Sequence, residues 1–224
     1  MSVKISSNKL YSIFFKEYGP QNWWPTIFTR KKQDCQLEIM LGAVLTQNTS
    51  WQNVEMALSN LHKAKLLNLE KLIRVRKDRL ARLIRPAGYF NQKAGYIKNL
   101  LSVYQKNPDG FQLPLIKARR LLLEIKGVGP ETADSILLYA FSQAIFVVDA
   151  YSLRLFSRLG LVKADARYEQ IQDFVHKSLS CPREKCVTIY NELHALIVRH
   201  AVEYCRIKPD CQGCVLGKYC RISK

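Results

Sequence analysis

The stretch Leu121-Leu-Leu-Glu-Ile-Lys-Gly-Val-Gly-Pro-Glu-Thr-Ala133 predicts a helix, a tight hairpin and a second helix. Gly127 and Gly129 allow backbone conformations that a side chain would penalise, and Pro130 suits the first turn of a helix, where its missing N–H has no partner. We expect the backbone N–H groups of Gly127, Val128 and Gly129 to face outward at the positive end of a helix dipole. Such a cradle can hold a phosphate without reading a base, although a G-x-G turn between helices is usually just a turn.

Hydrophobic residues recur at helical spacing on both sides of this hairpin. The pattern is clear in residues 37–45, 72–83 and 136–141, and no segment shows the alternation of a strand. Turn signals such as Asn107-Pro108-Asp109-Gly110 separate about ten helices with short connectors. The sequence therefore predicts an all-α protein, and its 224 residues, 48% of them hydrophobic, suffice for one large domain or two lobes.

The chain is strongly basic, with 35 Lys+Arg against 18 Asp+Glu and a formal net charge of +17. Such a charge attracts polyanions; DNA is the leading candidate, although RNA and membrane surfaces fit the charge equally well. One basic run fits either a nucleic-acid contact or a solvated helical face. It comprises Lys71, Arg74, Arg76, Lys77, Arg79 and Arg82.

The amino terminus lacks the apolar run of a signal peptide, and no stretch reaches the length of a membrane span. We therefore expect an intracellular protein, cytoplasmic or nucleoid-associated, that is a monomer with no membrane contact.

Four cysteines close the chain in a C-x5-C-x2-C-x5-C pattern: Cys205, Cys211, Cys214 and Cys220. Thiolates bind soft and borderline metals, so this loop suits either a single Zn²⁺ or an iron–sulfur cube, and the cysteines alone do not choose between them. The other three cysteines are Cys35, Cys181 and Cys186. In a reducing compartment we expect these three to be ordinary thiols rather than disulfide partners.

An apolar run, Phe146-Val-Val-Asp-Ala-Tyr151, delivers Asp149 to the start of an amphipathic segment, residues 151–161. An aspartate in that place is commonly a helix N-cap, which contributes about 1 kcal/mol and implies no chemistry. The functional alternative is a carboxylate that activates water or stabilises an oxocarbenium-like sugar cation while a glycosidic bond breaks. The local sequence favours the cap.

Taken together, these residues resemble the helix-hairpin-helix DNA glycosylase superfamily, and specifically its endonuclease III branch. The resemblance spans most of the chain and includes Leu45-Thr-Gln-Asn-Thr-Ser-Trp51 and Gly88-Tyr-Phe-Asn-Gln-Lys-Ala94. It implies base-excision repair of double-stranded DNA that contains damaged bases, with Asp149 as the catalytic residue. It also implies that Gln47 fills the space left by an extruded nucleotide, whereas the alternative for Gln47 is a polar cap on a buried helix.

The resemblance further implies a 4Fe-4S cluster on the four terminal cysteines, although their first spacing is one residue shorter than the C-x6-C usual in endonuclease III. It implies two helical lobes with the active site in the cleft between them. One lobe would span residues 31–143 and end in the hairpin. The other would combine residues 1–30 and 144–224 and carry the cluster loop at residues 205–220.

One position departs from the endonuclease III pattern. Bifunctional members of that branch carry a Schiff-base lysine two residues after the second hairpin glycine, where this chain has Glu131. A carboxylate cannot form that imine. Unless another lysine substitutes, Lys126 being the nearest candidate, the expected enzyme is monofunctional: it leaves an abasic site and an uncut strand, without AP lyase activity.

Aromatic residues suggest the substrate. Trp24, Pro25 and Trp51, together with Glu131 and residues 85–93, resemble the 3-methyladenine DNA glycosylase III type, in which the corresponding residues line the base pocket. Alkylated purines such as 3-methyladenine or 7-methylguanine are cationic and leave readily, and stacking on aromatic faces can select them at ~1–3 kcal/mol per base. The alternative for the tryptophans is packing in the core. Two other functions stay open: a bifunctional glycosylase/lyase for oxidised pyrimidines, and a non-catalytic DNA-binding protein.

Overall fold

The computed structural model describes residues 5–28 and 32–222. No β-strand occurs in these two ranges, so the prediction of an all-α protein is confirmed. The chain forms two compact units, which we call the hairpin unit (residues 24–143) and the cysteine unit (residues 1–23 and 144–224). The lobe boundary expected at residue 31 lies outside the described residues.

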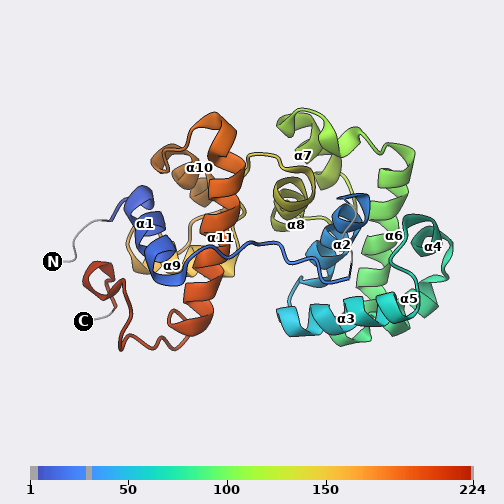
Figure 1. Ribbon diagram of the computed structural model, residues 1–224, viewed down its shortest axis with the longest axis horizontal. Coiled ribbons are helices and arrows are strands. Elements are labelled where there is room, and N and C mark those ends of the chain that lie inside the picture. Colours follow the sequence, from blue (N-terminus) through green and yellow to red (C-terminus); the bar gives the residue numbers. More distant parts are fainter. Residues whose placement is uncertain (1–4, 29–31, 223–224) are drawn as a thin grey trace. The chain divides into compact units, whose positions relative to one another are not determined.

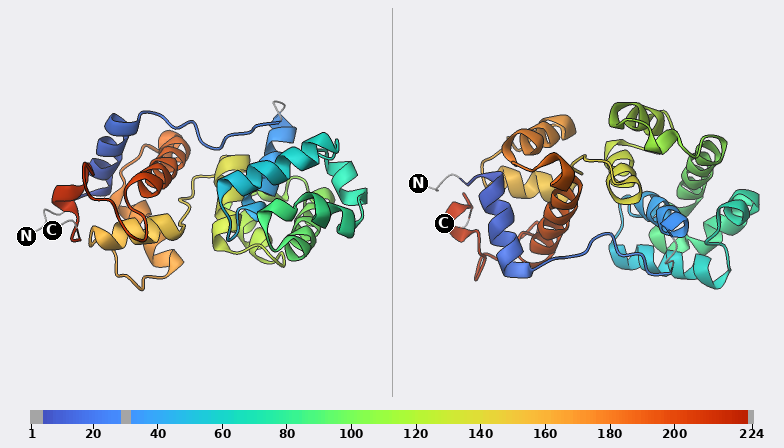
Figure 2. Two further views of the ribbon diagram at one scale, coloured as in Figure 1. Left: turned by 90° about the horizontal axis from the view of Figure 1, so that it is seen from below. Right: turned by 45° about the horizontal axis from the view of Figure 1, so that its top comes forward.

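The hairpin unit is built around helix α2 (Figures 1 and 2). Its α-helices are α2 (Lys32–Leu45), α3 (Trp51–Lys63), α4 (Leu69–Arg74), α5 (Lys77–Leu83), α6 (Phe90–Lys106), α7 (Leu115–Leu123) and α8 (Pro130–Ser135). Short 3₁₀ turns, η1 (Arg85–Ala87) and η2 (Gly110–Gln112), and a π-helical segment, η3 (Ile136–Ala140), complete it. Every residue from 37 to 45 is buried, because α2 packs against α3, α6, α8 and η3. A helix buried on all sides is the centre of a core.

The cysteine unit joins the two ends of the chain. It contains α1 (Ser7–Tyr18), α9 (Ala150–Arg158), α10 (Tyr168–Ser178) and α11 (Cys186–Glu203), with 3₁₀ turns η4 (Arg183–Lys185) and η5 (Gly217–Tyr219). The long helix α11 packs against both α1 and α9, so the blue amino-terminal helix lies beside the orange one in Figures 1 and 2. The fully buried Phe14, Phe146 and Phe156 fill the space between these helices.

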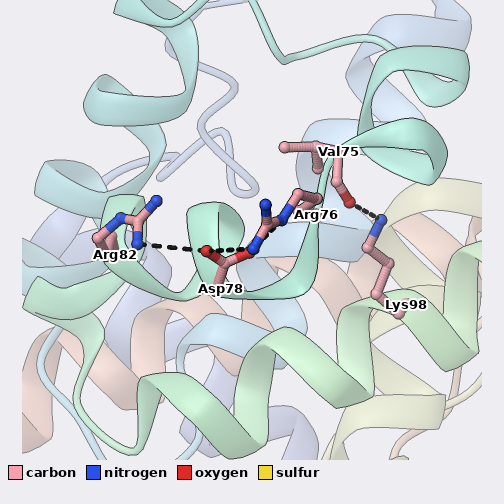
Figure 3. A network of polar contacts seen from close by, with 5 residues as sticks. All are labelled: Val75, Arg76, Asp78, Arg82 and Lys98. Carbon is pink, nitrogen blue, oxygen red and sulfur yellow. Dashed lines mark hydrogen bonds and ion pairs between the residues drawn. The ribbon is translucent and has the colours of Figure 1, made fainter.

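The helical pattern of residues 72–83 breaks into two helices at Val75, whose φ of −61° and ψ of 139° are extended. Lys98 on α6 explains the break (Figure 3). Its ammonium group donates to the carbonyl oxygens of Leu72 (2.8 Å), Ile73 (2.7 Å) and Val75. These are carbonyls that the end of α4 leaves without a helical partner.

One expectation about the cysteines is wrong. Cys181 and Cys186 form a disulfide, with their Cα atoms 5.3 Å apart, although we expected free thiols from the compartment alone. The turn at η4 brings the two residues within the range that a disulfide requires. Cys35 is outside any disulfide, as predicted. Over the described residues, no helix combines the length and the apolar composition that crossing a membrane would require.

Candidate functional site

The hairpin between α7 and α8 uses its two glycines differently. Gly127 has a φ of +100°, and a Cβ at this position would lie 2.1 Å from ring atoms of Tyr96. Gly129 is extended, with φ −92° and ψ 179°, and a Cβ there would meet no atom within 4 Å. The fold therefore requires a glycine at 127 for both conformation and packing. At 129 it does not, contrary to the expectation for both, and the missing side chain instead leaves the backbone open to approach.

Two of the three hairpin amides point to no protein acceptor. The N–H of Val128 donates to the carbonyl of Ile125 at 3.0 Å, and the Val128 side chain is buried, so this residue anchors the turn. Within the described ranges, the N–H groups of Gly127 and Gly129 donate to no carbonyl. The π-helical segment η3 continues α8 without a gap, so the positive end of this longer helix begins at the hairpin. The anion cradle therefore consists of these two glycine amides.

Side chains from other helices hold the hairpin. Gln47 lies in the turn after α2, and its Nε2 donates to the carbonyl of Gly127 (3.0 Å) and to Oγ1 of Thr132 (2.9 Å). On the other side, Nδ2 of Asn99 on α6 donates to the carbonyl of Lys126 at 3.0 Å. The half-buried Gln47 thus ties the hairpin to the first turn of α8 in this structure.

A buried ion pair, which sequence reasoning missed, joins α7 to α8. Arg119 binds Asp134 through two hydrogen bonds, Nε to Oδ1 at 2.7 Å and Nη2 to Oδ2 at 3.2 Å. The Asp134 side chain is 0% exposed and that of Arg119 is 23% exposed. Bidentate geometry of this kind fixes both distance and orientation. The signal in the sequence is opposite charges on helices flanking the hairpin, which is too common a pattern to single out one pair.

Glu131 occupies the first turn of α8 and is exposed. Lys126, the lysine nearest to it in the hairpin, is also exposed. The position expected to carry a lysine in bifunctional relatives is therefore occupied by a solvent-facing carboxylate.

Three aromatic rings cluster in the hairpin unit. The ring of Trp24 makes an edge-to-face contact with Trp51, with centroids 5.2 Å apart, and a tilted contact with Tyr139 at 5.0 Å. Trp24 also lies against Gly42 of α2, where a Cβ would approach its Cζ2 to 3.1 Å. Tyr139 was missed because it falls in an apolar run that predicts only core; the π-helical segment η3 brings its ring to the cluster.

The segment that carries Trp24 and Pro25 is held by a buried carboxylate. Glu38 on α2 is 1% exposed, and its Oε1 accepts the backbone N–H of Ile27 at 2.6 Å. The backbone N–H of Phe28 donates to the same carboxylate. Pro25 itself is exposed. Trp24 and Pro25 therefore lie on a segment whose backbone is bound to α2 just after them, whereas Trp51 begins α3.

Asp149 in the cysteine unit is the N-cap of α9. Its Oδ1 accepts the backbone N–H of Ser152 at 2.7 Å, and its Oδ2 lies 3.5 Å from Nε2 of His194 on α11. Both side chains are nearly buried, at 11% and 7% exposure. Burial alone would raise the pKa of Asp149, but the hydrogen bond and charge of His194 and the bonds from Ser152 outweigh it, so the pKa is lowered. Asp149 is therefore a cap and also a carboxylate held ionised at neutral pH.

The four terminal cysteines line one pocket of the cysteine unit, together with Arg158 and His200. Arg158 Nη1 donates to Sγ of Cys205 at 3.2 Å, and Sγ of Cys214 lies 3.7 Å from Nε2 of His200. Burial lowers the pKa of His200 to about 4, so this wall of the pocket is neutral. Among the described residues, no three His, Cys, Asp or Glu side chains are placed around a single metal ion.

The chemistry of these thiols fits a cationic group. Burial raises the pKa of Cys214, and the three other thiols, those of Cys211, Cys220 and Cys205, raise it further. Converging thiolates repel one another unless positive charge lies between them. Four sulfur donors lining one pocket suit an iron–sulfur cluster or a single Zn²⁺.

Known proteins resemble this chain along most of its length. A family model described as HhH-GPD superfamily base excision DNA repair protein matches residues 41–181. A protein of Methanocaldococcus jannaschii named "Putative DNA repair glycosylase" is 43% identical over 95% of this chain and 94% of its own length. Endonuclease III of Sulfolobus acidocaldarius is 28% identical over 96% of this chain and 95% of its own.

Two solved structures share the fold. The 3-methyladenine DNA glycosylase of H. pylori bound to 1,N6-ethenoadenine is 28% identical, with a TM-score of 0.74 over 89% of this chain and 98% of that one. A non-covalent endonuclease III–DNA complex is 21% identical, with a TM-score of 0.78 over 96% of this chain and 93% of that one. The second likeness concerns the fold alone.

Proposed function

This chain belongs to the HhH-GPD superfamily of base excision DNA repair proteins and is a DNA glycosylase, and we propose that it is monofunctional and removes alkylated purines. The observation that carries the substrate class is the cluster of Trp24, Trp51 and Tyr139. The 28% identical H. pylori protein is named a 3-methyladenine DNA glycosylase, which supports the same class.

An aromatic cluster suits a cationic base. Stacking on aromatic rings contributes ~1–3 kcal/mol per base, and a desolvated cation over an aromatic face about 2 kcal/mol more. Extruding a nucleotide costs a few kcal/mol, so the gain is of the size needed. Oxidised pyrimidines are neutral and would instead require hydrogen bonds to their edges.

In the proposed reaction, the bond between sugar C1′ and the purine nitrogen breaks, and its electron pair leaves with the purine, which becomes neutral. The sugar is left as an oxocarbenium-like cation, a water oxygen bonds to C1′, and a proton goes to solvent. Asp149 is ionised because of its lowered pKa, which makes it a weak base and a good electrostatic partner for the cation. His194 is a positioning residue, since it lies against Oδ2 and limits the rotation of the carboxylate.

Glu131 supports hydrolysis without strand cleavage. A carboxylate cannot form the imine through which a lyase works, and this one is exposed at the hairpin. The bifunctional alternative would need Lys126, which is also exposed there.

We propose further that Cys205, Cys211, Cys214 and Cys220 hold a 4Fe-4S cluster. When bound, such a cluster supplies positive metal charge and covalent cross-links between the four thiolates. The role of the protein residues is structural: Arg158 directs a hydrogen bond to Sγ of Cys205, and the neutral His200 adds no competing charge.

The test compares wild type with Asp149→Asn on duplexes that contain 3-methyladenine, 7-methylguanine or thymine glycol, each with and without alkali. We expect wild type to release only alkylpurines, to cut the strand only after alkali, and to form no borohydride-trapped adduct. Asp149→Asn should lower the single-turnover rate at least 100-fold, in line with the size of such catalytic effects. The control is Asp165→Asn, an exposed carboxylate of the same unit, which should leave the rate unchanged. Strand cleavage at thymine glycol without alkali would refute the proposal.

A further inference from the structure

Three of the six basic side chains in the run on α4 and α5 pair with neighbouring carboxylates, whereas Lys71, Lys77 and Arg79 make no such pair within the described residues. Arg76 and Arg82 both pair with Asp78, at 3.1 Å and 3.3 Å, as Figure 3 shows. Arg74 lies 4.0 Å from Glu70. Lys77 has no carboxylate partner in the described residues. The charge of Lys77 is therefore available to an outside anion.

The side chain of Lys77 runs across helix α6. A Cβ placed on Gly95 would lie 3.4 Å from Nζ of Lys77 and 3.5 Å from its Cε. These distances are ordinary van der Waals contacts, so the end of the lysine side chain lies directly against α6 at Gly95. Lys77 remains exposed, with its ammonium group over the surface of α6.

The same face of α6 supports the hairpin. Asn99, one helical turn after Gly95, binds the carbonyl of Lys126, and the ring of Tyr96 lies against Gly127. Residues four apart on a helix have Cβ atoms about 5–6 Å apart. The Lys77 ammonium group is therefore separated from the hairpin by roughly two Cβ–Cβ spacings of this kind. Since one strand of B-DNA carries a phosphate about every 3.4 Å along the helix axis, this distance spans only a few phosphates.

We propose that Lys77 is a second phosphate contact of this protein, on the DNA strand whose backbone the hairpin amides of Gly127 and Gly129 hold. The lysine side chain lies against α6 at Gly95, and the same helix contacts the hairpin through Tyr96 and Asn99. The proposal rests on the proposed hairpin contact with DNA, but not on the identity of the excised base. Its consequence is an electrostatic contribution to affinity that is independent of sequence and lesion.

The experiment measures the dissociation constant of a duplex with a stable abasic analogue over a series of salt concentrations. One neutralised phosphate contributes about −0.9 to the slope of log affinity against log salt. We expect Lys77→Ala to reduce the magnitude of the slope by about that amount, which is roughly an eightfold loss of affinity at 0.1 M salt, and Lys77→Arg to retain the slope. The matched control is Lys71→Ala, an exposed lysine of the same run on α4, which should keep the wild-type slope.

Single-turnover excision at saturating enzyme should be unchanged in Lys77→Ala, because the contact acts on binding. An unchanged slope in Lys77→Ala, or an equal reduction in Lys71→Ala, would overturn the inference, since the charge would then act only as part of a diffuse field. The result for Lys77 can be told apart from the test of the proposed alkylpurine activity. If wild type binds the duplex but releases no alkylpurine, the proposed substrate class is wrong. The comparison of salt-dependence slopes between wild type and the lysine variants would still be valid.

Discussion

The hairpin and the cysteine loop of residues 205–220 are held in opposite ways. Side chains from α2 and α6 bind the hairpin, and a buried ion pair locks its two helices. The cysteine loop is held at its first residues, where Arg154 and Arg158 on α9 bind the carbonyls of Cys205, Arg206 and Ile207. Its middle relies largely on local turns such as the Cys214 N–H to Cys211 carbonyl bond. Side chains of neighbouring helices fix the hairpin, whereas the proposed cluster would add cross-links that the middle of the cysteine loop otherwise lacks.

The largest loss in the free energy of unfolding should come from breaking the ion pair between Arg119 and Asp134. Arg119→Ala leaves the fully buried Asp134 without its bidentate partner, so we expect a loss of about 3–5 kcal/mol in the free energy of unfolding. Arg120→Ala is the matched control. Arg120 pairs with Glu124 at 83% and 63% side-chain exposure, and exposed pairs of this kind contribute less than about 0.5 kcal/mol. Urea unfolding measures both variants, and equal losses would mean that the pair does not hold the hairpin.

The two glycines should separate stability from binding. Gly127→Ala combines a left-handed backbone with a clash against Tyr96, so we expect a loss of about 2–4 kcal/mol. Gly129→Ala should change stability by less than about 0.5 kcal/mol, because the position is extended and open. The methyl group added at position 129 would nevertheless lie beside the N–H group of that residue and weaken DNA binding. Urea unfolding and a binding titration check both variants, and unchanged affinity in Gly129→Ala would remove the phosphate role of that amide.

The sequence predicted what is local. Glycines and a proline mark the hairpin, an aspartate before an amphipathic helix marks the cap, and cysteine spacing marks the loop, because each depends on neighbours within a few residues. The contact between Asp149 and His194 joins positions far apart in the chain, so no local pattern encodes it. The same holds for Tyr139 beside Trp24 and for the helix break at Val75, which a lysine from another helix stabilises. The disulfide was missed because a rule about compartments outweighed local geometry.

The sharpest test of the comparison between the hairpin and the cysteine loop should come from Cys214→Ser. All three other thiols act on this residue, so its loss should release the proposed cluster and its visible absorption. Because local turns alone then hold the middle of the loop, its amides should exchange with solvent almost as fast as in an unfolded chain, while those around Gly127 keep their protection. We expect the free energy of unfolding of the whole chain to fall by about 2 kcal/mol, because the loop buries Leu216 and a fully buried side chain of this size contributes about 1.5–3 kcal/mol.

Cys35→Ser is the control for this variant, because Cys35 belongs to the hairpin unit and to no disulfide, so its replacement should leave the absorption unchanged. Hydrogen exchange followed by mass spectrometry resolves the two regions in one experiment. If the amides of the cysteine loop stay protected from exchange after the visible absorption is lost, the loop is held by protein contacts alone, as the hairpin is. The contrast between the two regions would then lie in their ligands and not in how the chain holds them.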